Sequence, residues 1–276
     1  MIEDPSAREA PMHDADGEPG LPQMSELGMM QLLLSEDMER GSDEPPIAAS
    51  IGEQMLHMDM TPLPRSIRCR IRDVCSRIAT RNAILVGGGI GHLSAWLFDL
   101  WCPAFSDGKH SNTKRPDSFR IIEPGNRFGV IIDRLIRRYD AESWSSVIAL
   151  PWNEVAAEAA SVMAANFALP RASHGAILPM PLDLVVIDLP EEERASTASS
   201  AFDLLSPGGL ILVQEPKVPT GDVGTPSKGE DPTPAQTKVE SFNQWIKLVT
   251  DVNDNHSLGF AELTGGTLVA LLKADS

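Results

Sequence analysis

The chain has 276 residues and a mass of 29.8 kDa, long enough for one large domain with an appendage. Its 39 acidic residues exceed its 23 Lys and Arg, so the formal net charge is −16, and neither nucleic acid nor an anionic membrane is expected as a partner. Apolar runs are broken within about ten residues, well short of a membrane span. The three cysteines, Cys69, Cys75 and Cys102, are too few for a disulfide framework or a zinc site, so a reducing cytoplasm is the expected setting.

The excess of acid is concentrated at the N-terminus, where residues 1–45 hold twelve acidic and two basic side chains. Residues 1–24, rich in Pro, Gly and acids, are predicted to be a disordered leader, because they cannot bury enough apolar surface to offset the entropy of ordering. Amphipathic patterns over 27–38 and 47–60 predict two short helices in an N-terminal helical extension, residues 25–65. Their Met-rich faces are interpreted as packing on the main domain, with a cofactor lid or a partner surface as the alternative.

The pattern changes in the main domain, residues 66–276, where short β-branched runs alternate with longer helical periods. Helices are expected over residues 66–79, 92–100, 128–139, 155–168, 194–205 and 237–252. Strands are expected over residues 83–86, 119–122, 146–150, 182–187, 210–213, 257–263 and 267–272.

These strands predict an α/β fold. Nearly continuous apolar runs such as LDLVVID and GGLILVQ are typical of parallel strands that are covered on both faces. Only Thr-Gly-Gly separates the last two strands, which indicates a hairpin, so one of them is expected to run antiparallel at the sheet edge. The predicted fold class is a Rossmann-like, doubly wound, mostly parallel seven-stranded sheet with an antiparallel C-terminal hairpin strand.

A glycine-rich segment, ILVGGGIGHLS, leads from the first predicted strand directly into a helix. Gly87, Gly89 and Gly91 permit a tight turn and a close approach of a ligand, and free N–H groups at a helix start favour polar or anionic atoms. A tight turn without a ligand looks similar, so the loop alone is weak evidence. The dinucleotide fingerprint G-x-G-x-x-G requires a Gly where the sequence has His92, and this argues against NAD.

A second feature follows the next strand, where RIIEPG places Glu123 at the carboxyl edge of the sheet beside the glycine loop. A carboxylate at that point is able to accept hydrogen bonds from ribose hydroxyls. A solvated strand-end acid, or a cap for the following helix, is the alternative. The ribose role is favoured because it agrees with the glycine loop.

These motifs, together with the strand LDLVVIDLP and the unit FDLLSPGGLILVQEP, resemble those of class I S-adenosylmethionine (SAM)-dependent methyltransferases. The tail, from DPTPAQTKVESFNQW to the closing hairpin, is similar to that of the catechol and caffeoyl-CoA type O-methyltransferases. The resemblance implies SAM as the cofactor, with Gly87, Gly89 and Gly91 under its methionine part and Glu123 on its ribose. It also implies a contact of Trp152 with adenine, although an ordinary packing role for this Trp is an equal alternative.

The resemblance further implies Asp188 as the catalytic residue, at a position where O-methyltransferases hold a divalent cation such as Mg²⁺. Asp188 would hold the cation or position the acceptor. The Asp-Asn pair that completes the family's metal site is replaced by Gln214 and Glu215. Their side-chain oxygens still permit a metal site made of these three residues.

Other departures indicate a divergent member of the family. Leu85 stands where the family has an acid that binds the cofactor's amino group, Pro151 replaces an Asp, and Glu191 replaces a catalytic Lys. A carboxylate at position 191 does not offer the positive charge that helps a phenol to ionise. Cofactor binding is therefore better supported than metal-dependent catechol chemistry.

The predicted function is O-methylation of a small-molecule acceptor that carries a hydroxyl group, with a homodimer as a further expectation. A degenerate cofactor-binding module without activity is one alternative. A spermidine-synthase-like aminopropyltransferase is another, because it shares the Gly-Gly-Gly loop, but Ile90 stands where those enzymes have an acid. His92 and His174 are candidate bases, although a helix-start or loop His is more often a capping or surface residue. The Pro- and Gly-rich loop 217–235 is expected to be a substrate lid.

Overall fold

The computed structural model describes residues 25–105, 113–168, 176–220 and 231–274. The predicted leader and His174 lie outside these ranges, as does the middle of the loop 217–235. The helices are α1 (Glu26–Leu33), α2 (Pro46–His57), α3 (Arg65–Arg77), α4 (His92–Trp101), α5 (Asn126–Arg138), α6 (Trp152–Ala168), α7 (Glu191–Asp203) and α8 (Pro234–Asn255), with a 3₁₀ turn, η1 (Pro103–Phe105), after α4. The strands are β1 (Asn82–Val86), β2 (Ser118–Ile122), β3 (Ser145–Ile148), β4 (Leu182–Ile187), β5 (Leu205–Gln214), β6 (Ser257–Leu263) and β7 (Gly266–Leu272). None of the described helices is both long and apolar enough to cross a membrane.

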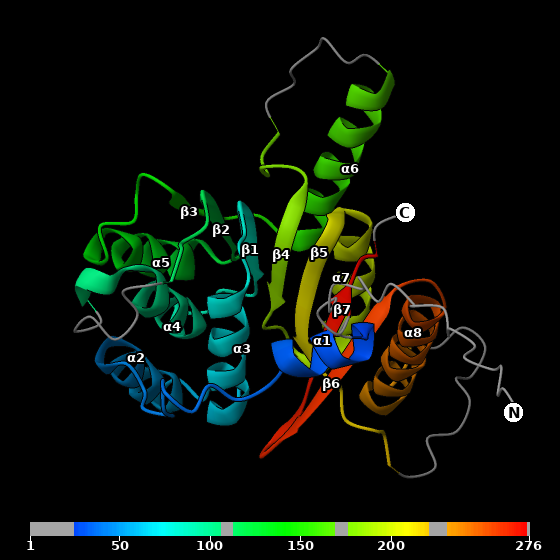
Figure 1. Cartoon of the computed structure of the whole chain (residues 1–276), viewed down its shortest axis with the longest axis horizontal. Helices are drawn as coiled ribbons and strands as arrows, with labels where there is room; N and C mark the ends of the chain where they lie inside the picture. The colour runs from blue at the N-terminus through cyan, green and yellow to red at the C-terminus, as the bar shows by residue number, and fades with distance from the viewer. Residues whose placement is uncertain (1–24, 106–112, 169–175, 221–230, 275–276) are drawn as a thin grey trace, which may run out of the picture.

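The strands form one sheet in the order β3-β2-β1-β4-β5-β7-β6, which can be followed in Figure 1. Strands β1 to β5 pair in parallel, and β7 pairs antiparallel with both β5 and β6. The predicted fold class is thereby confirmed. The expectation that the antiparallel strand lies at the edge is wrong, because β7 inserts between β5 and β6. Burial explains the choice: β7 is buried on both faces along its centre, whereas β6 alternates between buried and exposed residues, as suits an edge strand.

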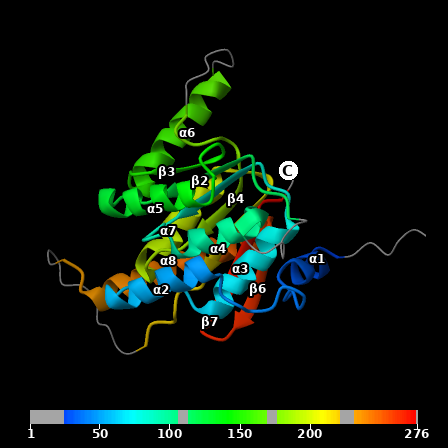
Figure 2. The ribbon, with the colours of Figure 1, turned by 90° about the vertical axis from the view of Figure 1, so that its left-hand side faces the viewer.

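Helices cover both faces of the sheet, as the two ribbon views show (Figures 1 and 2). Helices α3, α4 and α5 contribute to the hydrophobic core on one face, and α6, α7 and α8 to the core on the other. Helix α4 is buried along its whole length, because α2 and α3 pack against it. This doubly wound arrangement leaves the carboxyl ends of the parallel strands, and the loops that follow them, at one edge of the molecule.

Three helices begin three residues before their predicted starts: α6 at Trp152, α7 at Glu191 and α8 at Pro234. Their first turns read WNE, EEE and PAQ, which show no apolar periodicity. Acids and Pro nevertheless suit a helix start, because acids interact well with the positive end of the helix dipole and Pro lacks an N–H that would go unpaired there. The early starts matter for the site, since they place Trp152 and Glu191 in first helical turns.

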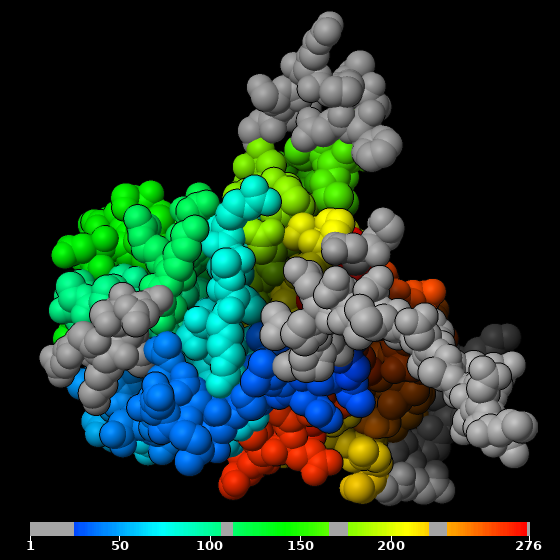
Figure 3. All heavy atoms as spheres, in the orientation of Figure 1, coloured from blue at the N-terminus to red at the C-terminus, as the bar shows by residue number. Residues whose placement is uncertain are grey.

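The N-terminal segment packs on the sheet domain at two places. Helix α1 lies on β6, where Gly259 makes room for Met30, because a Cβ on this glycine would overlap the Met30 side chain. Helix α2 packs on α4. Met30 and Met55 are buried, whereas Met29, Met38 and Met58 are exposed. The space-filling view shows this segment beside α3 and the C-terminal hairpin (Figure 3).

Candidate functional site

A pocket of about 590 Å³ opens at the carboxyl ends of the parallel strands. Its walls are the loops that follow β1, β2, β4 and β5, together with the chain between α2 and α3. Five of the predicted site residues line it: Gly87, Gly89, Glu123, Asp188 and Gln214. The other predicted residues, Gly91, Trp152 and Glu215, do not line this pocket.

Three glycines of the turn between β1 and α4 stand at positions where the backbone has a positive φ. Gly87, Gly89 and Gly91 have φ values of +93°, +50° and +91°, which L-residues with a side chain adopt only with strain. A Cβ on Gly87 would also overlap the carbonyl oxygen of Asp188. At Gly89, by contrast, only the Met60 methyl group lies within 4 Å of such a Cβ, at 3.6 Å. Gly89 is therefore the point at which the turn presents bare backbone to the pocket.

The amides of these glycines are paired within the protein. Gly87 and Gly88 donate to the carbonyl of Ile122 at 3.0 and 3.2 Å, and Gly91 donates to the carbonyl of Gly88 at 2.9 Å. The Gly89 amide donates to the Glu123 carboxylate at 2.7 Å. The free N–H groups expected at the helix start are therefore not those of Gly87, Gly88, Gly89 or Gly91. At these positions the turn offers a ligand a shaped backbone surface instead of hydrogen-bond donors.

Glu123 joins the glycine turn to the start of α5. Its Oε2 accepts from the Gly89 amide at 2.7 Å and its Oε1 accepts from the Gly125 amide at 3.1 Å, while the residue is only 8% exposed. Gly125 is the N-cap residue of α5, so the predicted capping role has a counterpart in the structure. Each carboxylate oxygen accepts more than one hydrogen bond. Glu123 thus keeps the capacity to accept hydroxyl groups from the pocket side.

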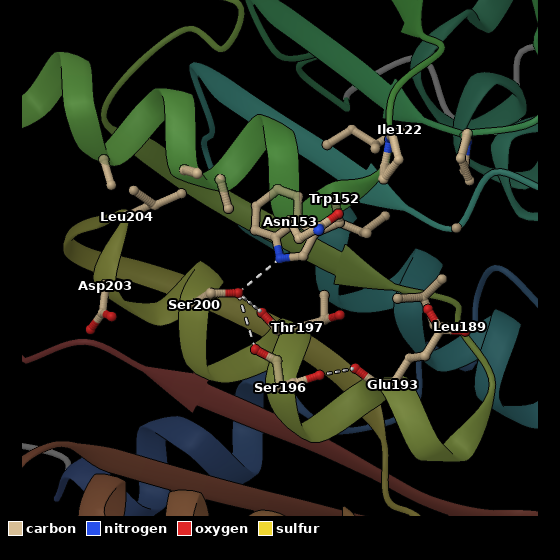
Figure 4. A pocket seen from close by; sticks show the side chains of 17 residues that line it. Ile122, Trp152, Asn153, Leu189, Glu193, Ser196, Thr197, Ser200, Asp203 and Leu204 are labelled. Carbon is tan, nitrogen blue, oxygen red and sulfur yellow. Dashed lines mark hydrogen bonds between the residues drawn. The ribbon is translucent and has the colours of Figure 1, made fainter.

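A second pocket, of about 530 Å³, lies between α6 and α7 and is drawn in Figure 4. Trp152 lines it, is 9% exposed, and donates from its Nε1 to the Ser200 hydroxyl at 2.8 Å. Pro124 and Pro151 are also in its wall. Trp152 belongs both to the hydrophobic core of this face and to the pocket wall, so the structure is consistent with both interpretations of this residue.

The two pockets are neighbours. Gly87 and Leu189 line both of them. Directly after β2, Glu123 lines the first pocket and the next residue, Pro124, lines the second. The two pockets therefore adjoin at the carboxyl ends of β1 and β4. The Glu123 carboxylate lies beside the junction.

Asp188 follows β4 and brings an unpartnered carboxylate to the first pocket. Within the described part of the chain, no side-chain hydrogen bond or ion pair involves it. Burial raises the pKa of Asp188 to about 6, an effect that the positive charges of Arg194 and Arg68 partly oppose. A carboxyl group with this pKa and a free face toward a pocket is able to exchange a proton with a ligand near neutral pH.

The donor set does not fit a divalent cation. The Gln214 side chain donates from its Nε2 to the Gly265 carbonyl at 3.0 Å, and Glu215 is absent from the pocket lining. No group of three or more His, Cys, Asp or Glu side chains comes together among the residues that the structure describes. Of the three predicted ligands, only Asp188 and Gln214 reach the same pocket, and a guanidinium lines it with them.

That guanidinium belongs to Arg194, a pocket residue that the sequence analysis missed. It is 8% exposed, its Nε donates to the Leu189 carbonyl at 2.8 Å, and its Nη1 donates to the Gln214 carbonyl at 3.2 Å. Arg194 lies one helical turn after Glu191 in α7, so the two residues share a face of the helix. This spacing is the signal in the sequence: the positive charge that is missing at position 191 is present three residues later.

His92, which the sequence offers as a candidate base, belongs to a cluster of polar side chains inside the protein. Its Nε2 lies 2.8 Å from Nη1 of Arg68 and 2.9 Å from Oε1 of Glu44, which also accepts from Nε1 of Trp96 at 3.3 Å. Burial lowers the pKa of His92, which favours the neutral ring. This group joins the N-terminal segment to α4 directly after the glycine turn, so the arrangement is that of a structural His.

Comparison with known proteins gives no match by sequence and many by structure. No family model matches the chain, and no curated protein sequence matches it. A putative caffeoyl-CoA O-methyltransferase from Staphylococcus aureus matches in structure with a TM-score of 0.53 at 13% identity, over 82% of this chain and 92% of that one. An O-methyltransferase from Bacillus cereus, solved in complex with SAH, matches with a TM-score of 0.52 at 14% identity, over 89% of this chain and 95% of that one. The chain has the fold of the SAM-dependent O-methyltransferases.

A putative O-methyltransferase from Klebsiella pneumoniae shares this methyltransferase fold, with a TM-score of 0.52 at 13% identity, over 89% of this chain and 94% of that one. These matches cover nearly the full length of the solved structures, so the methyltransferase fold is present as a whole. In such a sheet the ligand site lies outside the carboxyl ends of the strands. The first of the two pockets described above lies there, as does the end of the second that Gly87, Ile122 and Pro124 line.

Proposed function

We propose that this protein is a SAM-dependent methyltransferase that transfers a methyl group to a hydroxyl oxygen of a small molecule. The observation that carries the proposal is the pair of adjoining pockets on a methyltransferase fold, which meet at Gly87 and Leu189 with Glu123 beside the junction. SAM has a nucleoside at one end and a charged amino-acid chain at the other, and the two pockets give each end a compartment.

The chain's own residues would hold SAM from several sides. Bare backbone at Gly89 would permit a close approach of the methionine part, since the Met60 methyl group is the only atom within 4 Å of an added Cβ there, at 3.6 Å. The remaining lone pairs of Glu123 would accept the ribose hydroxyls, and Trp152 and Pro151 would form the apolar surroundings of adenine in the second pocket. Bound there, SAM supplies an electrophilic methyl group on a positively charged sulfur.

Asp188 would act on the acceptor. Its unpartnered carboxylate faces the first pocket and, with a pKa of about 6, is ionised at neutral pH yet close enough to neutrality to take up a proton. Asp188 would accept the proton of the acceptor hydroxyl, and SAM, when bound, would supply the methyl group to that oxygen and leave as SAH as its carbon–sulfur bond breaks. Most of the acceleration then comes from holding the oxygen in line with the methyl group, about 3 Å away.

The setting of the reaction is part of the same proposal. The three cysteines are free thiols, which supports a reducing cytoplasm. The net charge of −16 supports a small-molecule acceptor over a nucleic acid or a membrane lipid. A homodimer remains a prediction.

Calorimetry with S-adenosylhomocysteine (SAH) tests cofactor binding. We expect the wild type to bind SAH and Glu123→Gln to bind it about 10- to 100-fold more weakly, because an amide accepts fewer hydrogen bonds than a carboxylate. Glu142→Gln, which neutralises an exposed carboxylate that lines neither pocket, serves as the control and is expected to bind as the wild type does. Equal affinities in Glu123→Gln and the wild type would remove the basis of the proposal.

Turnover on a panel of phenols and catechols tests catalysis. Asp188→Asn is expected to lower the rate about 100-fold or more while SAH affinity is kept, because the variant loses the proton acceptor and not the cofactor site. SAH binding without turnover on any acceptor would favour the degenerate binding module. Much tighter binding of decarboxylated SAM than of SAM would favour the aminopropyltransferase.

A further inference from the structure

The pocket that would be the acceptor site, if the proposed function holds, contains a positive charge that the protein itself supplies. A guanidinium bridges the ends of two neighbouring strands at the place where a divalent cation is expected from the resemblance. Arg194 donates to the Leu189 carbonyl just after β4 and to the Gln214 carbonyl at the end of β5. These are the same two strand ends that carry the predicted metal ligands Asp188 and Gln214.

The position of Arg194 is fixed by the fold. The side chain is 8% exposed and crosses from the first turn of α7 to β5, with both carbonyl contacts in hydrogen-bond range. A guanidinium has five N–H donors, and these two contacts use two of them. The remaining donors belong to a residue that lines the first pocket, so positive hydrogen-bonding capacity is available to a ligand there.

Two carboxylates that line the pocket act electrostatically on Arg194, first Glu191 and then Asp188. Arg194 is in turn the largest of the positive influences on Asp188. Arg194 and Asp188 nevertheless form no ion pair or hydrogen bond with each other in the described structure. An oxygen atom of a ligand that carries a hydrogen is able to satisfy both, by donating to the carboxylate and accepting from the guanidinium.

We propose that Arg194 replaces the divalent cation of the acceptor site, so that the acceptor's hydroxyl oxygen is bound between Arg194 and Asp188 and the protein needs no metal. The guanidinium supplies the positive charge that stabilises the oxygen as it loses its proton to Asp188. Since it cannot chelate two oxygens in the way a metal ion does, the favoured acceptors are molecules with a single acidic hydroxyl, such as a simple phenol. An adjacent pair of hydroxyls brings no advantage.

The claim that Arg194 replaces a metal ion is tested without turnover by a direct measurement of Mn²⁺ binding, which uses the electron paramagnetic resonance of the free ion. We expect no binding to the wild type beyond that of a surface carboxylate, and the same result in Asp188→Asn. Arg194→Ala removes the guanidinium that binds the Leu189 and Gln214 carbonyls and acts on Asp188, and it should bind Mn²⁺ about tenfold or more tightly than the wild type, because a repelling positive charge is gone. Arg137→Ala removes an exposed Arg on α5 and so changes the net charge equally. This control should bind Mn²⁺ no more tightly than the wild type does.

Two results would overturn the claim that Arg194 replaces a metal ion. One is Mn²⁺ binding to the wild type that is lost in Asp188→Asn, and the other is unchanged weak binding in a folded Arg194→Ala. If Arg194→Ala does not fold, the comparison of the wild type with Asp188→Asn still decides. Neither measurement involves SAM, so failure here is distinct from failure of SAH binding, which would end the proposed function instead.

Turnover tests the role of Arg194 in the reaction and the preference for an acceptor with a single hydroxyl group. With 4-nitrophenol as acceptor, the wild-type rate should be the same in EDTA and in Mg²⁺, and 4-nitrocatechol should offer no gain in kcat/KM. Arg194→Gln should lower kcat/KM about 100-fold or more while SAH affinity stays at the wild-type value. Loss of turnover in EDTA, or an Arg194→Gln variant as active as the wild type, contradicts the role assigned to Arg194.

Discussion

Single residues of the glycine turn illustrate how much the site depends on backbone conformation. Gly87 combines a φ of +93° with a contact that leaves no room for a Cβ beside the Asp188 carbonyl. This contact holds the loops after β1 and β4 together, and these loops carry the residues shared by both pockets. Gly87 therefore acts on the shape of the site, whereas Gly89 faces its interior.

Gly87→Ala is expected to lower the free energy of unfolding by more than about 4 kcal/mol, because backbone strain and overlap with the Asp188 carbonyl add together. Gly41→Ala is the matched control: its φ is +63°, and nothing lies within 4 Å of an added Cβ. That change should cost only about 1 kcal/mol, the strain alone. Urea unfolding measures both, and similar values for the two variants would show that the contact with Asp188 is unimportant.

Asp188 predicts a dependence of stability on pH. Its pKa is 3.8 in the ordinary case and about 6 in the folded protein, because burial disfavours the charged form. A raised carboxyl pKa means that the folded state binds the proton more tightly than the unfolded chain does. The contribution of Asp188 is thus present in full below the unfolded value and is lost as the pH rises through the folded one.

Asp188→Asn should therefore be more stable than the wild type at about pH 8, by at most about 3 kcal/mol, and the difference should vanish near pH 4. Urea unfolding at a series of pH values measures this. Asp254→Asn, at an exposed position of α8, should show no such pH-dependent difference. A destabilised Asp188→Asn at high pH would mean that the ionised carboxylate has a stabilising partner.

Whole elements are held at the site by polar contacts that cross long stretches of sequence. The chain between α1 and α2 contributes Glu44, which binds Arg68 of α3 and lies 2.9 Å from Nε2 of His92 of α4. Since His92 follows the glycine turn, this group joins the N-terminal segment to the floor of the pocket. The same segment supplies Met55 and Met60 to the pocket wall.

Glu44→Gln is expected to lower the free energy of unfolding by about 3 kcal/mol, because it leaves the buried Arg68 without its carboxylate. Hydrogen exchange should rise in α2 and in the chain between α2 and α3 before it rises in β1. Glu53→Gln, at an exposed position of α2, is the control and should leave both quantities unchanged. Unchanged exchange in Glu44→Gln would show that apolar packing alone holds the segment in place.

At the scale of the whole molecule, the order of the strands decides which parts of the chain are central. Strand β7 lies at the C-terminal end of the sequence but pairs on both sides, whereas β6 pairs only with β7 in this sheet. The terminal strand is thus an interior element. The last strand in sequence and the last strand in space are different ones.

Hydrogen exchange followed by mass spectrometry should therefore find β7 as well protected as β1, and β6 less protected than either. The reason is that β7 has a strand on each side, whereas no strand in the described part of the chain pairs with the outer edge of β6. Peptides that cover residues 257–263 and 266–272 separate the two. Exchange of β7 at the rate of β6 would contradict the strand order.

The sequence by itself determined the alternation of helices and strands, the class of the sheet and the position of the glycine turn. These follow from local properties: apolar periodicity, β-branched runs, and glycines at points that need a positive φ. It also placed Glu123 and Asp188 at strand ends, and the carboxyl ends of parallel strands meet at one edge. Local pattern was therefore enough to bring these residues to the same pocket.

Only the tertiary structure decided how those residues are used. The pairing of the Gly89 amide with Glu123, the burial that raises the pKa of Asp188, and the reach of Arg194 to the end of β5 all join segments that are distant in sequence. The position of β7 inside the sheet is of the same kind. Such contacts depend on which surfaces meet in space, and periodicity within a single segment carries no information about its partner.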